Sequence, residues 1–186
     1  FGVEGMKIDL GGIAKGYTGQ KLAELFQEYG VSSALVSLGG NIQAIGTKPD
    51  GSSWKVGIRD PKGGQQDYIG VLSVENQTVV TSGGYERYFE EDGETYIHII
   101  NPRTGYPADG DLLSVTIVSK DGTLADGMST ALYIMGYEKA CQFWRQHREE
   151  FNVILVTDDG KIHISENLKG NFQTEWELEM IESGSE

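Results

Sequence analysis

The chain has 186 residues, of which 38% are hydrophobic and 26 are glycine, and its formal net charge is −13. This length is enough for one domain with a proper core, or for a large piece of a bigger one. No basic stripe interrupts the acidic surplus, which excludes nucleic acid and anionic membrane surfaces as favoured partners. Cys141 is the single cysteine, so an intrachain disulfide is excluded, and no apolar run approaches the length of a bilayer span.

The first part of the chain predicts one helix followed by short strands. Apolar residues recur at roughly helical spacing before Gly30, which predicts an amphipathic helix over residues 13–29. Val79 and Val80 are predicted to end a strand just before the Thr-Ser-Gly-Gly segment at 81–84. Other strands, separated by turns rich in Pro, Asp and Gly, are predicted at 34–38, 42–45, 54–58 and 69–74.

The second part of the chain predicts a hairpin, two helical segments and closing strands. Alternating residues from Tyr88 to Ile97 break at Asp92-Gly93, which is the signal of a hairpin. Helical periodicity is interrupted once, at Gly136. The predicted segments are a strand at 113–118, helices at 124–135 and 138–148, and strands at 153–156, 161–164 and 176–180.

Strands joined by short turns, with two helical regions inserted, predict an α+β fold around a largely antiparallel sheet. We find no internal repeat and no linker, so residues 1–181 are predicted to form a single domain. Residues 182–186 are predicted to be a disordered, solvated tail.

The segment HIINPRTGYP, residues 98–107, places chemically useful side chains where the predicted hairpin ends. His98 and Arg103 lie on a turn that Pro102 and Gly105 stiffen, because proline fixes its own φ and glycine tolerates positive φ. A ring that titrates and a guanidinium on a rigid turn suit an anionic ligand. The alternative is a plain turn whose Arg103 meets a surface carboxylate.

Asp126 and Thr130 are four residues apart on a predicted helix and therefore share one face. A carboxylate with a hydroxyl provides oxygen ligands that suit Mg²⁺, which keeps water and phosphate oxygens for its other positions. The alternative is that Asp126 caps the helix and Thr130 bonds back to the backbone.

Glycine pairs occur at two further points that could bind an anion. Gly11 and Gly12 precede the first predicted helix, and Lys15 follows one turn later, so free N–H groups and a cation could face the same ligand. The segment at 81–84 could form a donor-rich backbone nest. The alternative for Gly11-Gly12 is an ordinary turn before the helix, and the alternative for the segment at 81–84 is a plain entry into the hairpin. Aromatic residues are expected to pack the hairpin, namely Tyr85, Tyr88, Phe89 and Tyr96.

In this order along the chain, the motifs DLGGIAKGY, SLGGNI, TSGGYERYF, HIINPRTGYP and LADGMSTAL resemble the ApbE family, the FAD:protein FMN transferases. The resemblance runs from Asp9 to about Gly136. It implies a T-fold-like ApbE architecture and Mg²⁺-dependent transfer of FMN from FAD to a Thr or Ser hydroxyl of an acceptor protein. By resemblance, the metal ligands are the side chains of Asp126 and Thr130 and the backbone carbonyl of Gly12, with Ser129 beside them.

The resemblance also assigns the residues that hold and act on the flavin substrate. Asp9, Lys15 and the backbone near Ile100 correspond to FAD contacts, and His98 corresponds to the catalytic base. An imidazole suits this role because its ordinary pKa lies close to neutral pH. Arg103, like Lys15, could neutralise charge on the pyrophosphate. The other histidines, His147 and His163, lack motif partners and are expected to be incidental.

The chain begins at FGVEGMKIDLGG without an initiator methionine, which suggests the interior of a longer protein. Family members carry a further region before the DLGGIAKGY motif, and that region supplies part of the flavin and adenine pocket. An extracytoplasmic, possibly membrane-anchored location and a possible homodimer are expected from resemblance alone. The alternatives to transfer are a flavin- or nucleotide-binding module without activity and a metal-dependent FAD pyrophosphatase.

Overall fold

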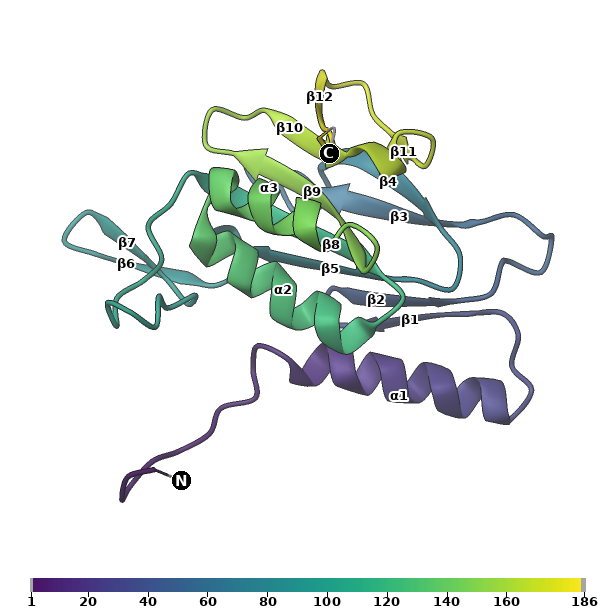
Figure 1. Cartoon of the computed structure of the whole chain (residues 1–186), viewed down its shortest axis with the longest axis horizontal. Helices are drawn as coiled ribbons and strands as arrows, with labels where there is room; N and C mark the ends of the chain where they lie inside the picture. The colour runs from purple at the N-terminus through teal and green to yellow at the C-terminus, as the bar shows by residue number, and fades with distance from the viewer. Residues whose placement is uncertain (1, 185–186) are drawn as a thin grey trace.

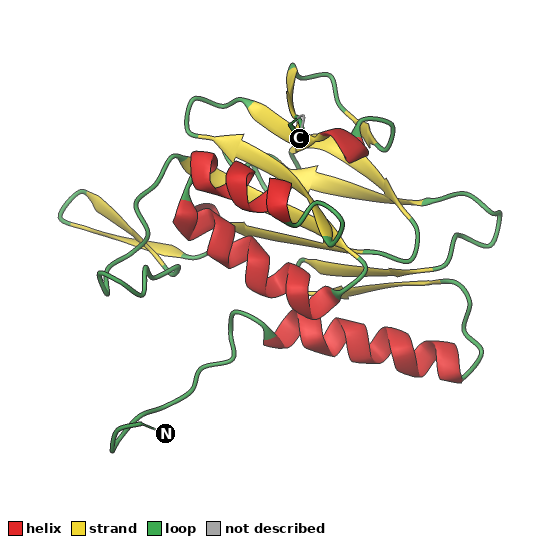
Figure 2. Ribbon diagram, in the orientation of Figure 1, coloured by secondary structure: helices red, strands yellow, loops and turns green. Residues whose placement is uncertain are grey.

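The computed structural model describes residues 2–184, and it arranges them in three layers (Figures 1 and 2). The central layer is a seven-stranded sheet of order β1-β2-β5-β8-β9-β10-β12. Helices cover one face of this sheet, and a three-stranded sheet of order β11-β4-β3 covers the other. A two-stranded hairpin, β6-β7, projects from the body of the molecule. The predicted α+β class is therefore confirmed.

Three helices occupy the two predicted helical regions, and local sequence sets their ends. They are α1 (Ala14–Glu28), α2 (Gly122–Met135) and α3 (Tyr137–Gln146). The Asp121 carboxylate accepts a 2.9 Å hydrogen bond from Leu124 N and so caps α2. Gly136 separates α2 from α3 with a φ of 78°, a value that favours glycine. α3 is shorter than predicted at its C-terminal end. No described helix is long and apolar enough to cross a membrane.

The strands follow the predicted order closely. β10 and β12 pair in parallel, while all other described strand pairs are antiparallel, as expected for short connections. The bounds are β1 (Ala34–Leu38), β2 (Asn41–Ile45), β3 (Trp54–Arg59), β4 (Tyr68–Val74), β5 (Thr78–Gly83), β6 (Tyr88–Glu91), β7 (Glu94–Ile97), β8 (Leu112–Ser119), β9 (Phe151–Thr157), β10 (Ile162–Ser165), β11 (Phe172–Gln173) and β12 (Leu178–Ile181). The two-residue strand β11 was not predicted.

The core lies on both faces of the central sheet, because its strands alternate their side chains between the two covering layers. Val115 and Ile117 of β8 pack beneath α2 and α3 together with the fully buried Trp144. On the opposite face, Val79 and Val118 pack against Leu72 of the small sheet. The central sheet is therefore a stiff platform, and side chains on β5 have well-defined positions.

The structure corrects the prediction for the segment at 81–84. β5 does not end at Val80: it continues through Ser82 to Gly83, and Ser82 pairs with Val115 of β8. The backbone of residues 81–83 is used in the ladder and forms no anion-binding nest, whereas Gly84 begins the 3-10 helix (Gly84–Glu86) that leads into the hairpin. Long-range pairing with β8 outweighs the tendency of Gly and Ser to form turns.

The hairpin turn is confirmed, since Asp92 and Gly93 both have positive φ, at 54° and 82°. Phe89 and Tyr96 stack on the hairpin with ring centroids 5.0 Å apart. Tyr85 lines a cavity together with Tyr88, Thr95 and Ile97 of the hairpin, and the Arg59 guanidinium lies 4.8 Å from the centroid of its ring.

The remaining predictions concern Cys141 and the C-terminus. Cys141 is a free, buried thiol, and burial raises its pKa. Residues 182–184 contain no helix or strand, while residues 185–186 of the predicted tail lie outside the described residues.

Candidate functional site

The first turn of α1 and the middle of α2 are joined by one buried hydrogen bond. Gly16 N donates to Asp126 Oδ2 over 2.7 Å, across 110 residues of sequence. Ile13, at the N-cap of α1, provides no side-chain acceptor. Asp126 therefore satisfies an N–H group at the positive end of α1. The alternative that Asp126 caps its own helix is wrong, because Asp121 has that role.

Two oxygen atoms beside this hydrogen bond have no protein donor. Gly12 lies before the N-cap of α1, so its carbonyl is outside the hydrogen-bond ladder of the helix, and the amide four residues later, Gly16 N, donates to Asp126. Within residues 2–184, no hydrogen bond uses the Gly12 carbonyl oxygen or Asp126 Oδ1. Asp126 is only 5% exposed. A carboxylate oxygen and a carbonyl oxygen that accept from no donor among the described residues are the oxygen ligands that a hard cation takes, so these residues fit Mg²⁺.

Thr130, one turn after Asp126 on α2, carries a further hydroxyl oxygen. Its Oγ1 lies 3.2 Å from Ser82 Oγ on β5, and Ser82 Oγ lies 2.8 Å from Ser129 Oγ. Ser129, rather than Thr130, donates back to the helix, to the Asp126 carbonyl over 2.9 Å. The alternative reading of Thr130 as a back-bonded helix residue is therefore wrong. Sequence reasoning also missed Ser82, because its partners are 47 and 48 residues away.

Lys15 and Asp9 flank this site on the N-terminal side. Lys15 is exposed, and its Nζ donates to the Gly39 carbonyl over 3.4 Å. The exposed Asp9 accepts from Gly11 N over 2.7 Å, which shapes the turn that precedes α1.

Asn41 is a buried donor without a partner, and sequence reasoning did not single it out. It is 6% exposed, and its Nδ2 has no hydrogen-bond partner among the described residues. Asn41 shares a face of β2 with Gln43, whose Cβ lies near Gly19 of α1. An unsatisfied buried amide on the helical side of the sheet is a feature of ligand sites. A polar residue directly after the Gly39-Gly40 turn is the signal that could have found it.

His98 follows β7 directly and is held in one tautomer by the base of the hairpin. Its Nδ1 lies 3.0 Å from the Arg87 carbonyl. Because a carbonyl oxygen only accepts, Nδ1 carries the proton and Nε2 keeps a free lone pair. The ring is exposed. His98 is therefore oriented to accept a proton from an incoming group.

The turn after His98 has the predicted geometry. Asn101 Oδ1 accepts from Arg103 N over 3.0 Å, and Gly105 has a φ of 74°. Ile100 forms an isolated bridge with Pro107. Arg103 makes no ion pair with the side chains that the structure describes, so the alternative in which it meets a surface carboxylate is not seen among them. Instead it lines a small cavity beside Ala131 and Met135 of α2.

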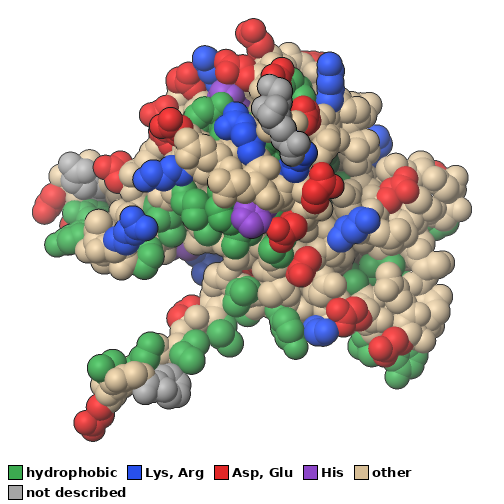
Figure 3. Space-filling view, viewed as in Figure 1, with side chains coloured by type: hydrophobic (Ala, Val, Ile, Leu, Met, Phe, Trp, Pro, Cys, Tyr) green, Lys and Arg blue, Asp and Glu red, His purple; other side chains and the backbone are tan. Residues whose placement is uncertain are grey.

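The structure thus brings the predicted residues together in two groups. Asp126 and Thr130 lie one turn apart on α2, and Asp126 contacts the first turn of α1, which Gly12 precedes and which contains Lys15. His98, Ile100 and Arg103 belong to the hairpin exit, and no hydrogen bond or ion pair among the described residues joins them to the first group. Figure 3 shows the N-terminal segment extending away from the body of the molecule, below the side that carries the hairpin.

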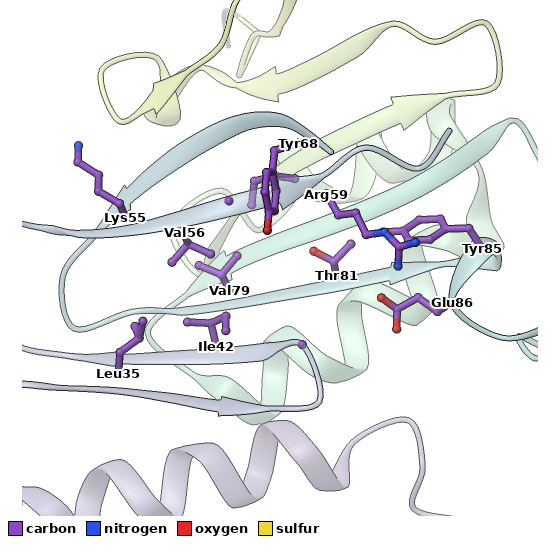
Figure 4. Close-up of a pocket in the computed structure, with 13 residues that line it drawn as sticks. Leu35, Ile42, Lys55, Val56, Arg59, Tyr68, Val79, Thr81, Tyr85 and Glu86 are labelled. Atoms are coloured by element: carbon purple, nitrogen blue, oxygen red, sulfur yellow. The ribbon is translucent and has the colours of Figure 1, made fainter. Parts of the chain in front are cut away.

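A separate cavity of about 300 Å³ lies between the central sheet and the small sheet (Figure 4). Its floor is apolar, with Ile42, Val56 and Val79, and Arg59 and Tyr85 lie at one end. Burial, as the largest cause, raises the pKa of Tyr85 to about 12. The lining contains none of the predicted site residues, and the cavity is on the sheet face opposite α2. It is therefore distinct from the candidate site.

Comparison with known sequences is consistent with this arrangement. The ApbE family profile matches residues 2–155, which is longer at both ends than the motifs alone suggest. An FAD:protein FMN transferase of Klebsiella pneumoniae is 43% identical over 161 residues, covering 87% of this chain and 49% of that protein. One from Treponema pallidum is 47% identical over 150 residues, covering 76% of this chain and 41% of that protein.

Solved structures give the same result for the fold. The ApbE protein of Thermotoga maritima superposes with a TM-score of 0.82 at 38% identity, over 90% of this chain and 54% of that one. The flavin transferase ApbE of Vibrio cholerae gives a TM-score of 0.76 at 32% identity, over 88% and 52%. The chain spans about half the length of the curated relatives it matches. On its motifs, its fold and these matches, the chain belongs to the ApbE family.

Proposed function

We propose that this protein transfers FMN from FAD to a Thr or Ser hydroxyl of an acceptor protein in a Mg²⁺-dependent reaction. The observation that carries the proposal is the hydrogen bond from Gly16 N to Asp126 Oδ2, which joins the first motif to the last. The relatives named FAD:protein FMN transferase support the reaction type.

In this proposal Asp126, Thr130 and the Gly12 carbonyl hold the cation. The support is their oxygen chemistry and the lack of protein donors to Asp126 Oδ1 and to the Gly12 oxygen within residues 2–184. When bound, Mg²⁺ would neutralise charge on the pyrophosphate oxygens of FAD. Asp126 also anchors the N-terminus of α1, so the ligand and the helix end are positioned together.

His98 is proposed as the general base. Its Nε2 accepts the proton of the acceptor hydroxyl as that oxygen forms a bond to the FMN phosphorus. The bond from this phosphorus to the bridging oxygen breaks, and AMP leaves with the electron pair. Nδ1 keeps its own proton and donates it in a hydrogen bond to the Arg87 carbonyl, which keeps the ring in the productive orientation.

The FAD contacts are proposed from the two flanks of the site. Lys15 and Arg103 are exposed cations in an acidic protein and could pair with phosphate oxygens. Asp9 and the backbone at Ile100 are the other proposed contacts. The unpartnered Asn41 amide offers a further donor to a polar atom of the ligand.

The proposal is tested with the full-length gene product, FAD, Mg²⁺ and an acceptor protein, by intact mass measurement. Transfer adds one FMN to the acceptor and releases AMP, whereas hydrolysis releases AMP and free FMN. His98→Gln should reduce the transfer rate by about 10²–10⁴-fold, because a general base is lost. FAD affinity should stay within a few-fold of wild type, since the ring is not assigned to FAD binding.

His147→Gln is the matched control, because this histidine lies at the end of α3 and contacts Glu150 instead of the site. It should transfer at the wild-type rate. Transfer by His98→Gln at the rate of this control would remove His98 as the base. AMP production without any mass gain on the acceptor would replace transfer by hydrolysis.

A further inference from the structure

Ser82 of β5 connects the candidate cation ligands through a continuous chain of hydroxyl groups. Ser82 Oγ lies 2.8 Å from Ser129 Oγ and 3.2 Å from Thr130 Oγ1. Ser129 Oγ lies 2.9 Å from the Asp126 carbonyl oxygen. Ser129 is fully buried, and Ser82 and Thr130 are half-buried. Three hydroxyls and one carbonyl are therefore linked in a row beneath α2.

The direction of every hydrogen bond in this row follows from counting protons. A carbonyl only accepts, so the single proton of Ser129 points to the Asp126 carbonyl. The contact between Ser129 and Ser82 then requires the proton of Ser82. Because that proton is used, the contact between Ser82 and Thr130 requires the proton of Thr130. If Ser82 donated to Thr130 instead, the oxygens of Ser82 and Ser129 would lie 2.8 Å apart with no proton between them, and this contact would be repulsive.

The proton of Thr130 is thereby directed to the sheet, and its lone pairs are left for another partner. A hydroxyl coordinates a cation through a lone pair, so its proton must point away from the ion. We propose that Ser82 is a positioning residue that fixes the Thr130 hydroxyl in the orientation required of a ligand to a hard divalent cation. This inference rests on the cation site of the proposed function, and it assigns a role to a residue outside the ligand set.

The position of Ser82 suits this role. β5 lies inside the central sheet between β2 and β8, so the Ser82 oxygen is held by a stiff backbone. Without Ser82, the Thr130 hydroxyl loses the contact that orients it among the described hydrogen bonds and could rotate about its C–O bond. Mutation of a residue that orients a metal ligand through a hydrogen bond typically lowers metal affinity by about 10–100-fold.

The test is a Mn²⁺ titration of the full-length gene product with FAD and without acceptor, followed by electron paramagnetic resonance. Mn²⁺ takes the same carboxylate, carbonyl and hydroxyl ligands as Mg²⁺ and is directly visible. Ser82→Ala should weaken Mn²⁺ binding by about 10-fold or more. Asp126→Ala should remove the site and defines the background signal.

Two comparisons separate positioning from folding. The side chains introduced by Ser82→Thr and Ser82→Val have nearly the same shape, but only threonine keeps the hydroxyl. Mn²⁺ affinity should therefore be retained in Ser82→Thr and lost in Ser82→Val. Thr81→Ala is the matched control, because Thr81 is adjacent, faces the other side of β5 and makes a similar 2.8 Å hydroxyl contact with Thr116. It should bind Mn²⁺ as wild type does.

The outcomes distinguish this inference from the function on which it rests. Mn²⁺ binding that depends on Asp126 but is equal in wild type, Ser82→Ala and Ser82→Val would refute the role of Ser82 and leave the cation site in place. Wild-type binding that Asp126→Ala does not change would refute both. Loss in Ser82→Ala and Ser82→Val, with retention in Ser82→Thr and Thr81→Ala, would establish the positioning role.

Discussion

At the scale of single residues, the environments of two histidines differ sharply. His98 is exposed, and its Nδ1 contacts the Arg87 carbonyl. His163 is 5% exposed, and its Nδ1 lies 3.0 Å from the Tyr137 hydroxyl and 3.4 Å from Glu179 Oε2. The sequence offered no partner for His163, yet the structure gives it two. Its role is therefore structural, in the region where β10 pairs with β12.

This environment predicts how stability depends on pH. Burial lowers the pKa of His163, against the smaller opposing effect of Glu179, while Lys161 lowers it further and Asp159 raises it. The unfolded chain therefore binds the proton more readily than the folded protein. The contribution of His163 to the free energy of unfolding is therefore fully present above a pH of about 6.5, the ordinary pKa of the unfolded chain. It is lost as the pH falls through the lower pKa that His163 has in the folded protein.

The measurement is urea unfolding of wild type and His163→Gln at about pH 7.5 and about pH 5.5. Wild type should lose more free energy of unfolding over this interval than His163→Gln, because the variant has no imidazole to protonate. Equal losses in the two proteins would mean that His163 does not determine the pH dependence.

At the scale of elements, the packing of α1 on α2 depends on two glycines. A Cβ on Gly16 would lie 2.1 Å from the Gly122 carbonyl oxygen and 2.5 Å from Asp126 Cβ. A Cβ on Gly122 would lie 2.8 Å from the Gly16 carbonyl oxygen. The helices can approach this closely only without side chains at both positions, and that approach brings Gly16 N to Asp126.

Gly16→Ala should therefore destabilise the protein although alanine favours helices. The obstructing atoms belong to the backbone of α2, so the helices must separate, at a cost of about 1–3 kcal/mol. Gly19→Ala, one turn further along α1, is the control. Its Cβ would lie 3.7 Å from Gln43 Cβ, an ordinary contact, and alanine should stabilise the helix by up to about 1 kcal/mol.

Urea unfolding of both variants measures the change in the free energy of unfolding, which should fall in Gly16→Ala and rise in Gly19→Ala. A Gly16→Ala protein as stable as Gly19→Ala would show that the close approach of α1 and α2 is not required. Gly16→Ala should also weaken Mn²⁺ binding, because it separates Asp126 from the first turn of α1.

At the scale of the whole molecule, the excess of 28 acidic over 15 basic residues is the dominant electrostatic feature. Acidic and basic side chains are both spread over the visible surface (Figure 3). Net charge of one sign favours expansion through self-repulsion. Exposed ion pairs such as Lys21 with Glu24 offset little of this.

Salt should therefore stabilise the protein. Raising NaCl from about 10 mM to about 150 mM shortens the screening length from about 30 Å to about 8 Å, so repulsion weakens. The melting temperature should rise by about 2–4 °C for each kcal/mol gained. The gain should shrink as the pH approaches the isoelectric point of 4.6, where the net charge vanishes. A constant gain at every pH would point to a cause other than net charge.

The sequence by itself determined the fold class, the order of the elements and most of their bounds. These depend on local patterns, such as the positive φ values that Asp92 and Gly93 can adopt, or the glycine at 136 that separates two helices. The residue types of the candidate site were also predictable, because the ordered motifs resemble one family and its profile matches residues 2–155.

Only the tertiary structure decided how these residues act on one another. Asp126 accepts a hydrogen bond from α1 instead of capping α2, and Ser82 directs the hydroxyl of Thr130 from inside a strand predicted to end earlier. The partners are 110 and 48 residues apart, so no local pattern encodes their contact. The packing of α1 and α2 on each other and on the central sheet brings them together, and it depends on the whole chain.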